Sequence, residues 1–87
     1  MKYAAFIRYG NDSDQIATVR PKHREYLGSL KEQGKLALAG PFSDDSGALI
    51  IYEADSAGAA RALIEADPFR QAGVFQAIEL KEWRQVF

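Results

Sequence analysis

The 87 residues suffice for one domain, 1–87, and so short a chain buries only about 60–65% of the surface exposed on unfolding. The absence of cysteine excludes disulfides and thiolate metal sites, and one histidine cannot build a histidine-rich metal cage. A formal net charge of −1, with scattered lysines and arginines, argues against a nucleic-acid partner, which needs a basic patch. We therefore expect association between copies of the chain to supply additional stability.

Cellular targeting signals are not evident. The first residues, Met1 to Arg8, lack the long apolar region of a signal peptide. No stretch approaches the roughly 20 apolar residues that a membrane span requires. These patterns predict a cytoplasmic protein without a membrane partner.

The N-terminal third predicts a strand followed by a helix. Lys2 to Tyr9 is rich in aromatic and β-branched residues and alternates as a strand does. From Asp14 to Gln33 the apolar spacing becomes helical, and Gly34 is a typical stop. Pro21 predicts either a short turn before it or a helix that begins at it. One stripe, about 100° wide, contains Ile16, Val19, His23, Tyr26, Leu27 and Leu30.

The rest of the chain predicts a hairpin, a short helix and a last strand. Ser56 is a good N-cap for the helix, and Asp67 for a turn that follows it. The expected elements are strands Lys35–Ala39 and Ala48–Ala54 around a loop at 43–47, a helix Ala57–Ala66, a turn Pro68–Gly73, a strand Phe75–Leu80, and a tail with Trp83 and Phe87.

This order, β-α-β-β-α-β, predicts a ferredoxin-like α+β fold with two helices on one face of a four-stranded antiparallel sheet. The other sheet face is bare and apolar, with either Leu49 and Ile51 or Ile50 and Tyr52 on it. An exposed apolar face of this size typically marks an interaction site. We expect a homodimer that forms through the sheet face.

His23, the one histidine, lies within the apolar stripe, so its ring nitrogens need partners. It is a candidate general acid or base because its ordinary pKa is about 6.5. The alternative is a core histidine that bonds a backbone carbonyl or Tyr26. Asp67 is explained by capping alone, and sequence spacing cannot show whether it reaches His23. Contact is possible because both helices pack on the same face.

The other polar residues have ordinary explanations. Two adjacent loop carboxylates without further ligands are a poor metal signal. The serines have no base within sequence reach, so a nucleophilic triad is unsupported. We expect solvated or paired roles for Asp44, Asp45, Arg8, Arg20 and Arg24, and no catalytic role for Ser29 and Ser43.

Several short motifs occur in an order that resembles the YCII-related family, and the likeness spans nearly the whole chain. The first of them, Arg20-Pro21-Lys22-His23-Arg24-Glu25-Tyr26-Leu27, surrounds the histidine. The others are Leu38–Phe42 with Asp44–Gly47, Ala66–Phe69, Ala72–Phe75 and the aromatic C-terminal segment Glu79–Phe87.

The resemblance implies a ferredoxin-like fold of the dimeric α/β-barrel type and an active site centred on His23 and Asp67. A few family members are linked to the degradation of chlorinated aromatic compounds, including dehydrochlorination of a chlorinated hydroxyquinol. The fold is also similar to that of muconolactone isomerase, another proton-transfer catalyst.

These residues suggest a lyase or isomerase that acts on a small cyclic or unsaturated substrate without cofactor or metal. His23 would move a proton, and Asp67 would accept a hydrogen bond from its other ring nitrogen. Tyr26, Phe42 or Phe69 would line the pocket, and the loop after Pro41 would close over it. The alternatives are a non-catalytic ligand-binding or sensing dimer, a cofactor-independent monooxygenase, and a purely structural dimer.

Overall fold

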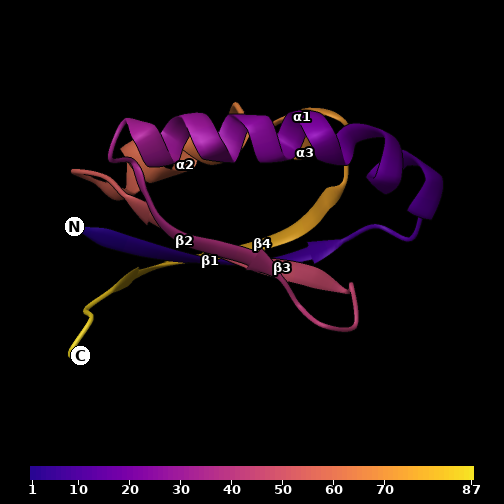
Figure 1. Ribbon diagram of the computed structural model, residues 1–87. Coiled ribbons are helices and arrows are strands. Elements are labelled where there is room, and N and C mark those ends of the chain that lie inside the picture. The colour runs from indigo at the N-terminus through magenta and orange to yellow at the C-terminus, as the bar shows by residue number, and fades with distance from the viewer.

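The computed structural model describes residues 1–87 and shows one sheet with all helices on one face (Figure 1). The predicted α+β order of elements is confirmed, with one additional single-turn helix, α3. The elements are β1 (Lys2–Tyr9), α1 (Ser13–Glu32), β2 (Leu36–Pro41), β3 (Gly47–Glu53), α2 (Ala57–Glu65), α3 (Pro68–Gln71) and β4 (Phe75–Trp83).

The sheet has the strand order β2-β3-β1-β4, and all three pairings are antiparallel. Ala5 of β1 lies opposite Ile50 of β3 and Leu80 of β4. Because side chains alternate along a strand, this register places Ala5, Ile50 and Tyr52 beneath the helices. Leu49 and Ile51 therefore lie on the face opposite the helices. Of the two pairs predicted for the bare face, this pair is the one that lies there.

The hydrophobic core fills the space between the sheet and the helices. The predicted stripe of α1 is confirmed: His23 and Leu30 are buried, and the stripe's other members pack against the core. Burial of this face stabilises the helix more than its propensity does. The twelve core residues are Ala5, Ile7, Tyr9, Leu30, Leu36, Ala48, Ile50, Tyr52, Ile64, Phe69, Val74 and Phe75.

Helix α1 runs without interruption through Pro21, so neither predicted boundary at this proline is right. The helix begins earlier because Asp12 caps it by accepting a hydrogen bond from the backbone N–H of Gln15 at 3.1 Å. Ile16 and Val19 then hold the first turns against the core. Pro21 removes only one donor, and Figure 1 shows that the first turns lie at an angle to the rest of the helix.

Two strands are longer than predicted. β2 continues through Pro41, which pairs with Ala48, and β4 continues to Trp83, which pairs with Lys2. The prediction of Trp83 in the tail is therefore wrong. The predicted strand ends were set where the apolar sequence pattern stops. The backbone pairing continues further because the hydrogen bonds between strands do not depend on the side chains.

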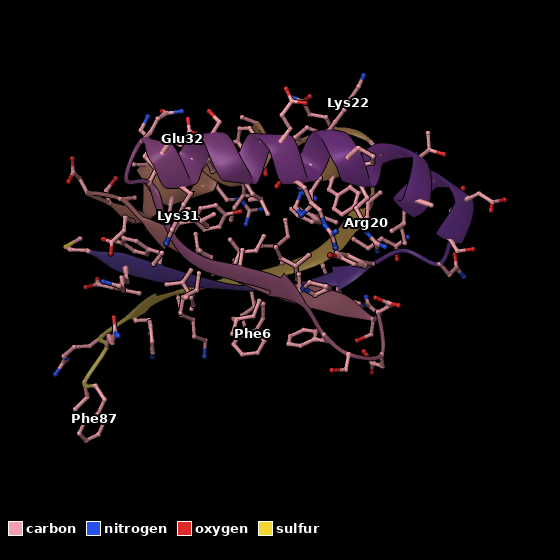
Figure 2. The ribbon with its side chains drawn as sticks, viewed as in Figure 1. Phe6, Arg20, Lys22, Lys31, Glu32 and Phe87 are labelled. Carbon is pink, nitrogen blue, oxygen red and sulfur yellow. The ribbon has the colours of Figure 1, made fainter.

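The sheet face opposite the helices is uncovered, and Figure 2 shows Phe6 projecting from it. Phe6 is 53% exposed and Leu38 63% exposed, and Phe42 and Trp83 are also exposed. We call this surface the open face. The C-terminus lies on the same side (Figure 1). None of the helices combines the length and the apolar character that crossing a membrane requires.

Candidate active site

The structure brings His23 and Asp67 into direct contact, although 44 positions separate them in the chain. Nδ1 of His23 lies 2.8 Å from Oδ1 and 3.0 Å from Oδ2 of Asp67. The histidine is 6% exposed and the aspartate is fully buried. The carboxylate can therefore fix the orientation of the imidazole ring.

Asp67 reaches this position as the N-cap of α3. Its Oδ1 accepts a hydrogen bond from the backbone N–H of Phe69 at 2.8 Å, and Pro68 occupies the first turn. The predicted capping role is therefore present together with the contact to His23. One buried carboxylate satisfies both a helix end and an imidazole.

The hydrogen bond determines which imidazole nitrogen is available. A carboxylate accepts but does not donate, so Nδ1 of His23 donates to Asp67. Nε2 forms no hydrogen bond within the chain, and in the neutral ring it carries the lone pair. Bonding to a backbone carbonyl or to Tyr26, the alternative considered above, does not occur.

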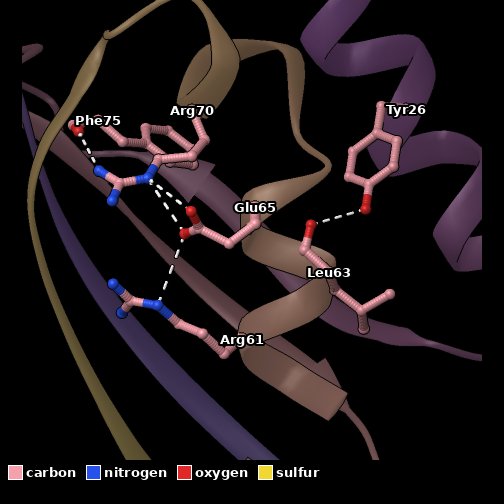
Figure 3. A network of polar contacts seen from close by, with 6 residues as sticks. All are labelled: Tyr26, Arg61, Leu63, Glu65, Arg70 and Phe75. Atoms are coloured by element: carbon pink, nitrogen blue, oxygen red, sulfur yellow. Dashed lines mark hydrogen bonds and ion pairs between the residues drawn. The ribbon is translucent and has the colours of Figure 1, made fainter. Parts of the chain in front are cut away.

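Tyr26 instead connects α1 to α2. Its hydroxyl donates to the carbonyl of Leu63 at 2.6 Å (Figure 3), and burial raises its pKa, so it remains protonated. Arg70 anchors α3 to α2 and β4 (Figure 3). Its Nη1 donates to the carbonyl of Phe75, and its Nε lies 3.1 Å from Glu65. These contacts hold the single turn that carries Asp67.

Two aromatic rings enclose the imidazole of His23. Phe69 stacks on it, with ring centroids 4.0 Å apart and planes 13° apart. Phe75 meets it edge-on at 5.9 Å. The hydrogen bond between His23 and Asp67 is thus shielded from water on these sides, which strengthens it electrostatically.

A pocket of about 230 Å³ opens between α1 and the sheet beside His23. Of the three aromatic residues expected there, only Phe69 lines it: Tyr26 points to α2, and Phe42 stacks on Phe6 at the open face. The lining residues are Tyr9, Arg20, His23, Arg24, Leu27, Ala39, Gly40, Pro41, Ala48, Ile50 and Phe69.

Three of these polar residues were not predicted as site residues. Arg20 and Arg24 are four residues apart, which places them on the same side of α1, and both line the pocket with His23. Tyr9 lies on β1, and its hydroxyl forms no hydrogen bond within the chain. Burial raises the pKa of Tyr9, and Arg20 opposes this effect. The protonated hydroxyl can donate to a ligand.

The remaining candidates lie elsewhere. Arg8 lines a hollow on the other side of the sheet. Asp44 accepts hydrogen bonds from the backbone and hydroxyl of Ser46, which lower the pKa of this carboxyl, and Asp45 has a positive φ of 60°, as expected of turn residues. Ser29 accepts a hydrogen bond from Gln33. No cluster of three or more acidic or histidine side chains capable of holding a metal ion occurs.

The fold and the buried His–Asp pair define a small ferredoxin-like α+β protein with a histidine-centred pocket. The sequence profile of the YCII-related domain matches residues 1–84. The chain therefore belongs to the YCII-related family, as its motifs indicated.

Similar proteins include Protein YciI from Escherichia coli, which is 35% identical over the full length of both chains, and the corresponding protein from Shigella flexneri. An uncharacterised protein, YjpA, from Bacillus subtilis is 37% identical and covers 71% of this chain and 72% of its own. Among solved structures, the 5-chloro-2-hydroxyhydroquinone dehydrochlorinase from Burkholderia phenoliruptrix, in complex with 2,5-dihydroxybenzoquinone, superposes with a TM-score of 0.84. It is 28% identical, and the alignment covers 97% of this chain and 94% of that one.

Proposed function

We propose that this protein is a small-molecule lyase or isomerase in which His23 moves a proton and Asp67 orients it. The observation that carries the proposal is the imidazole itself: Nδ1 is bound to a buried carboxylate, whereas Nε2 has no partner and His23 lines a pocket. The dehydrochlorinase activity of the structural neighbour supports the lyase class.

The chemistry follows from these groups. Nε2 of His23 takes a proton from the substrate, and the resulting imidazolium is stabilised by Asp67 across the hydrogen bond at Nδ1. In an elimination, the electron pair left by the proton expels a leaving group such as chloride. In an isomerisation, the same proton returns to another carbon. Both reactions balance without an external oxidant or reductant.

The pocket is suited to a small ring. Its volume of about 230 Å³ is below the roughly 300–1,000 Å³ of pockets for drug-sized ligands. Leu27, Ile50 and Phe69 supply apolar walls, and the hydroxyl of Tyr9 supplies a donor. A monocyclic substrate with oxygen substituents matches this lining.

We also propose that two copies pair through the open face. The exposed Phe6, Leu38 and Trp83 share a hollow of about 560 Å³ with Ile51. Contact between two such faces would bury these side chains, which is the stabilisation expected for a chain of this length.

Turnover of 5-chloro-2-hydroxyhydroquinone tests the enzymatic proposal, with chloride release and quinone absorbance as readouts. We expect His23→Gln to reduce the rate about 10²–10⁴-fold, as for loss of a general base. Asp67→Asn should lower it less, and Lys22→Gln, a change on the solvent side of α1, should leave it unchanged (Figure 2). A panel of lactones tests isomerisation with the same variants.

Oxygen uptake is recorded in parallel, because a monooxygenase would consume oxygen and an elimination does not. Equal rates for the wild type and His23→Gln contradict the proposal. So does saturable binding without turnover of any substrate in the panel, which favours a binding module.

A further inference from the structure

The pocket beside His23 contains two cationic side chains and no anion to balance them. Arg20 is half-buried and Arg24 is exposed at the rim. Neither guanidinium forms an ion pair or a hydrogen bond within the chain. Arg61 and Arg70, in contrast, share Glu65, and the two other arginines without such a contact, Arg8 and Arg84, do not line this pocket.

The nearby carboxylates do not form ion pairs with Arg20 or Arg24. Both oxygens of Asp67 are occupied by His23, and Oδ1 also accepts from Phe69. Asp45 shares a separate hollow with Arg20 but forms no ion pair with it. Both guanidinium groups line the pocket and are therefore free to bind an anionic ligand there.

We infer that the pocket selects a small planar carboxylate, which Arg20 and Arg24 bind beside Nε2 of His23. This inference rests on the proposed function, since it assigns a substrate class to the same site. Residues four apart on a helix are neighbours on its surface, so the two guanidinium groups can approach one carboxylate. Arginine matches carboxylates by its flat, two-pronged donor geometry.

The rest of the lining favours an unsaturated or aromatic acid over an aliphatic one. The stacked ring of Phe69 and the side chains of Leu27 and Ile50 provide a flat apolar space next to the guanidinium groups. The carboxylate fixes one end of such a ligand, and its ring or double bond then lies beside His23. This arrangement positions one carbon for proton transfer.

Binding of benzoate, followed by NMR of the His23 imidazole and the backbone amides, tests the inference. Benzamide has the same shape without the charge and serves as the matched ligand, and inorganic phosphate is the competing oxyanion. We expect benzoate to bind at this pocket, benzamide to bind at least about tenfold more weakly, and added salt to weaken benzoate.

Charge-removing variants distinguish specific binding of benzoate by the two arginines from a general effect of positive charge. Arg20→Gln should weaken benzoate about tenfold or more, and Arg24→Gln about two- to fivefold because it is exposed. Arg20→Lys should fall between Arg20→Gln and the wild type, because it keeps the charge and loses the planar geometry. Lys22→Gln removes the same charge from the side of α1 that faces away from the sheet (Figure 2) and should have no effect.

Equal binding of benzoate and benzamide, or unchanged binding of benzoate by Arg20→Gln, overturns the inference. Absence of benzoate binding, or tighter binding of phosphate at the same residues, also overturns it. His23→Gln distinguishes this failure from that of the proposed function. If His23→Gln binds benzoate and retains turnover, the carboxylate site stands and the catalytic role of His23 falls.

Discussion

Nδ1 of His23 lies within hydrogen-bond distance of both oxygens of Asp67, at 2.8 and 3.0 Å. This two-oxygen contact leaves the ring little freedom to rotate, and stacking on Phe69 restricts it further. The unpaired Nε2 is consequently held in one direction relative to the pocket. Pre-organisation of this kind is what proton transfer to a bound substrate requires.

Asp67→Asn should change the state of His23 while the helix cap survives, because asparagine is also a good N-cap. We expect the ¹⁵N spectrum of the wild type to show a proton on Nδ1, and that of Asp67→Asn to show altered proton occupancy. Asp67→Ala removes both the cap and the acceptor of the Nδ1 proton and should lower the free energy of unfolding by about 2–4 kcal/mol. Identical imidazole spectra for Asp67→Asn and the wild type would show that the pair has no influence on His23.

Gly47 and Gly28 form a matched pair for testing the sheet. A Cβ at Gly47 would lie 1.8 Å from the carbonyl oxygen of Ile7, within the β1–β3 pairing, so Gly47→Ala should cost about 3 kcal/mol or more. A Cβ at Gly28 meets nothing within 4 Å, so Gly28→Ala should stabilise the helix by about 0.5–1 kcal/mol. Urea unfolding measures both. Equal effects would contradict the register of β1 against β3.

Tyr52 carries a buried hydroxyl with no hydrogen-bond partner. Burial raises its pKa, so the hydroxyl is neutral but unsatisfied. Tyr52→Phe should therefore raise the free energy of unfolding by about 1 kcal/mol. Tyr26→Phe is the control and should lower it by about 1–2 kcal/mol, because the carbonyl of Leu63 loses its donor. A similar loss in both variants would reveal a partner for Tyr52.

Glu53 gives one part of the pH dependence of stability. A hydrogen bond from Lys2, at 2.6 Å from Oε1, lowers the pKa of Glu53 below its ordinary 4.5. A lowered pKa in the folded state stabilises the protein above pH 4.5, and this contribution disappears as pH falls through the folded-state value. The stability difference between the wild type and Glu53→Gln should shrink on acidification. A constant difference would contradict this linkage.

Phe6→Lys tests the proposed pairing, since Phe6 projects from the open face and is 53% exposed. We expect the wild type to sediment as a dimer and Phe6→Lys as a folded monomer, because two such charges would be desolvated in the interface. Ala17→Lys, on the exposed side of α1, should remain dimeric. A monomeric wild type would contradict the pairing.

The predicted elements followed from alternation and helical spacing, and the confirmed stripe of α1 shows why: burial of one face enforces the pattern. The continuity of α1 through Pro21 was not predictable because tertiary contacts of Ile16 and Val19 stabilise turns that local rules would end. The family resemblance indicated His23 and Asp67 together, whereas spacing could not show their contact.

The arginines of the pocket show a different limit of sequence interpretation. A charged residue beside an apolar stripe is typically solvated, so Arg20 and Arg24 were expected to be surface residues. Arg20 lies three residues before His23, Arg24 lies three before Leu27, and the two arginines are four apart, and this spacing was the available signal. Its meaning depends on the sheet below, because residues of β1, β2, β3 and α3 turn that helix face into a pocket.

The edge strand β2 separates the pocket beside His23 from the hollow of the open face and borders both of them. Its residues Ala39, Gly40 and Pro41 line the pocket beside His23 on one side and the hollow of the open face on the other. A displacement of this strand therefore changes the width of both hollows at once. Under the proposed pairing, contact at the open face would act on the same strand that bounds the pocket, so assembly and ligand selectivity would be mechanically linked.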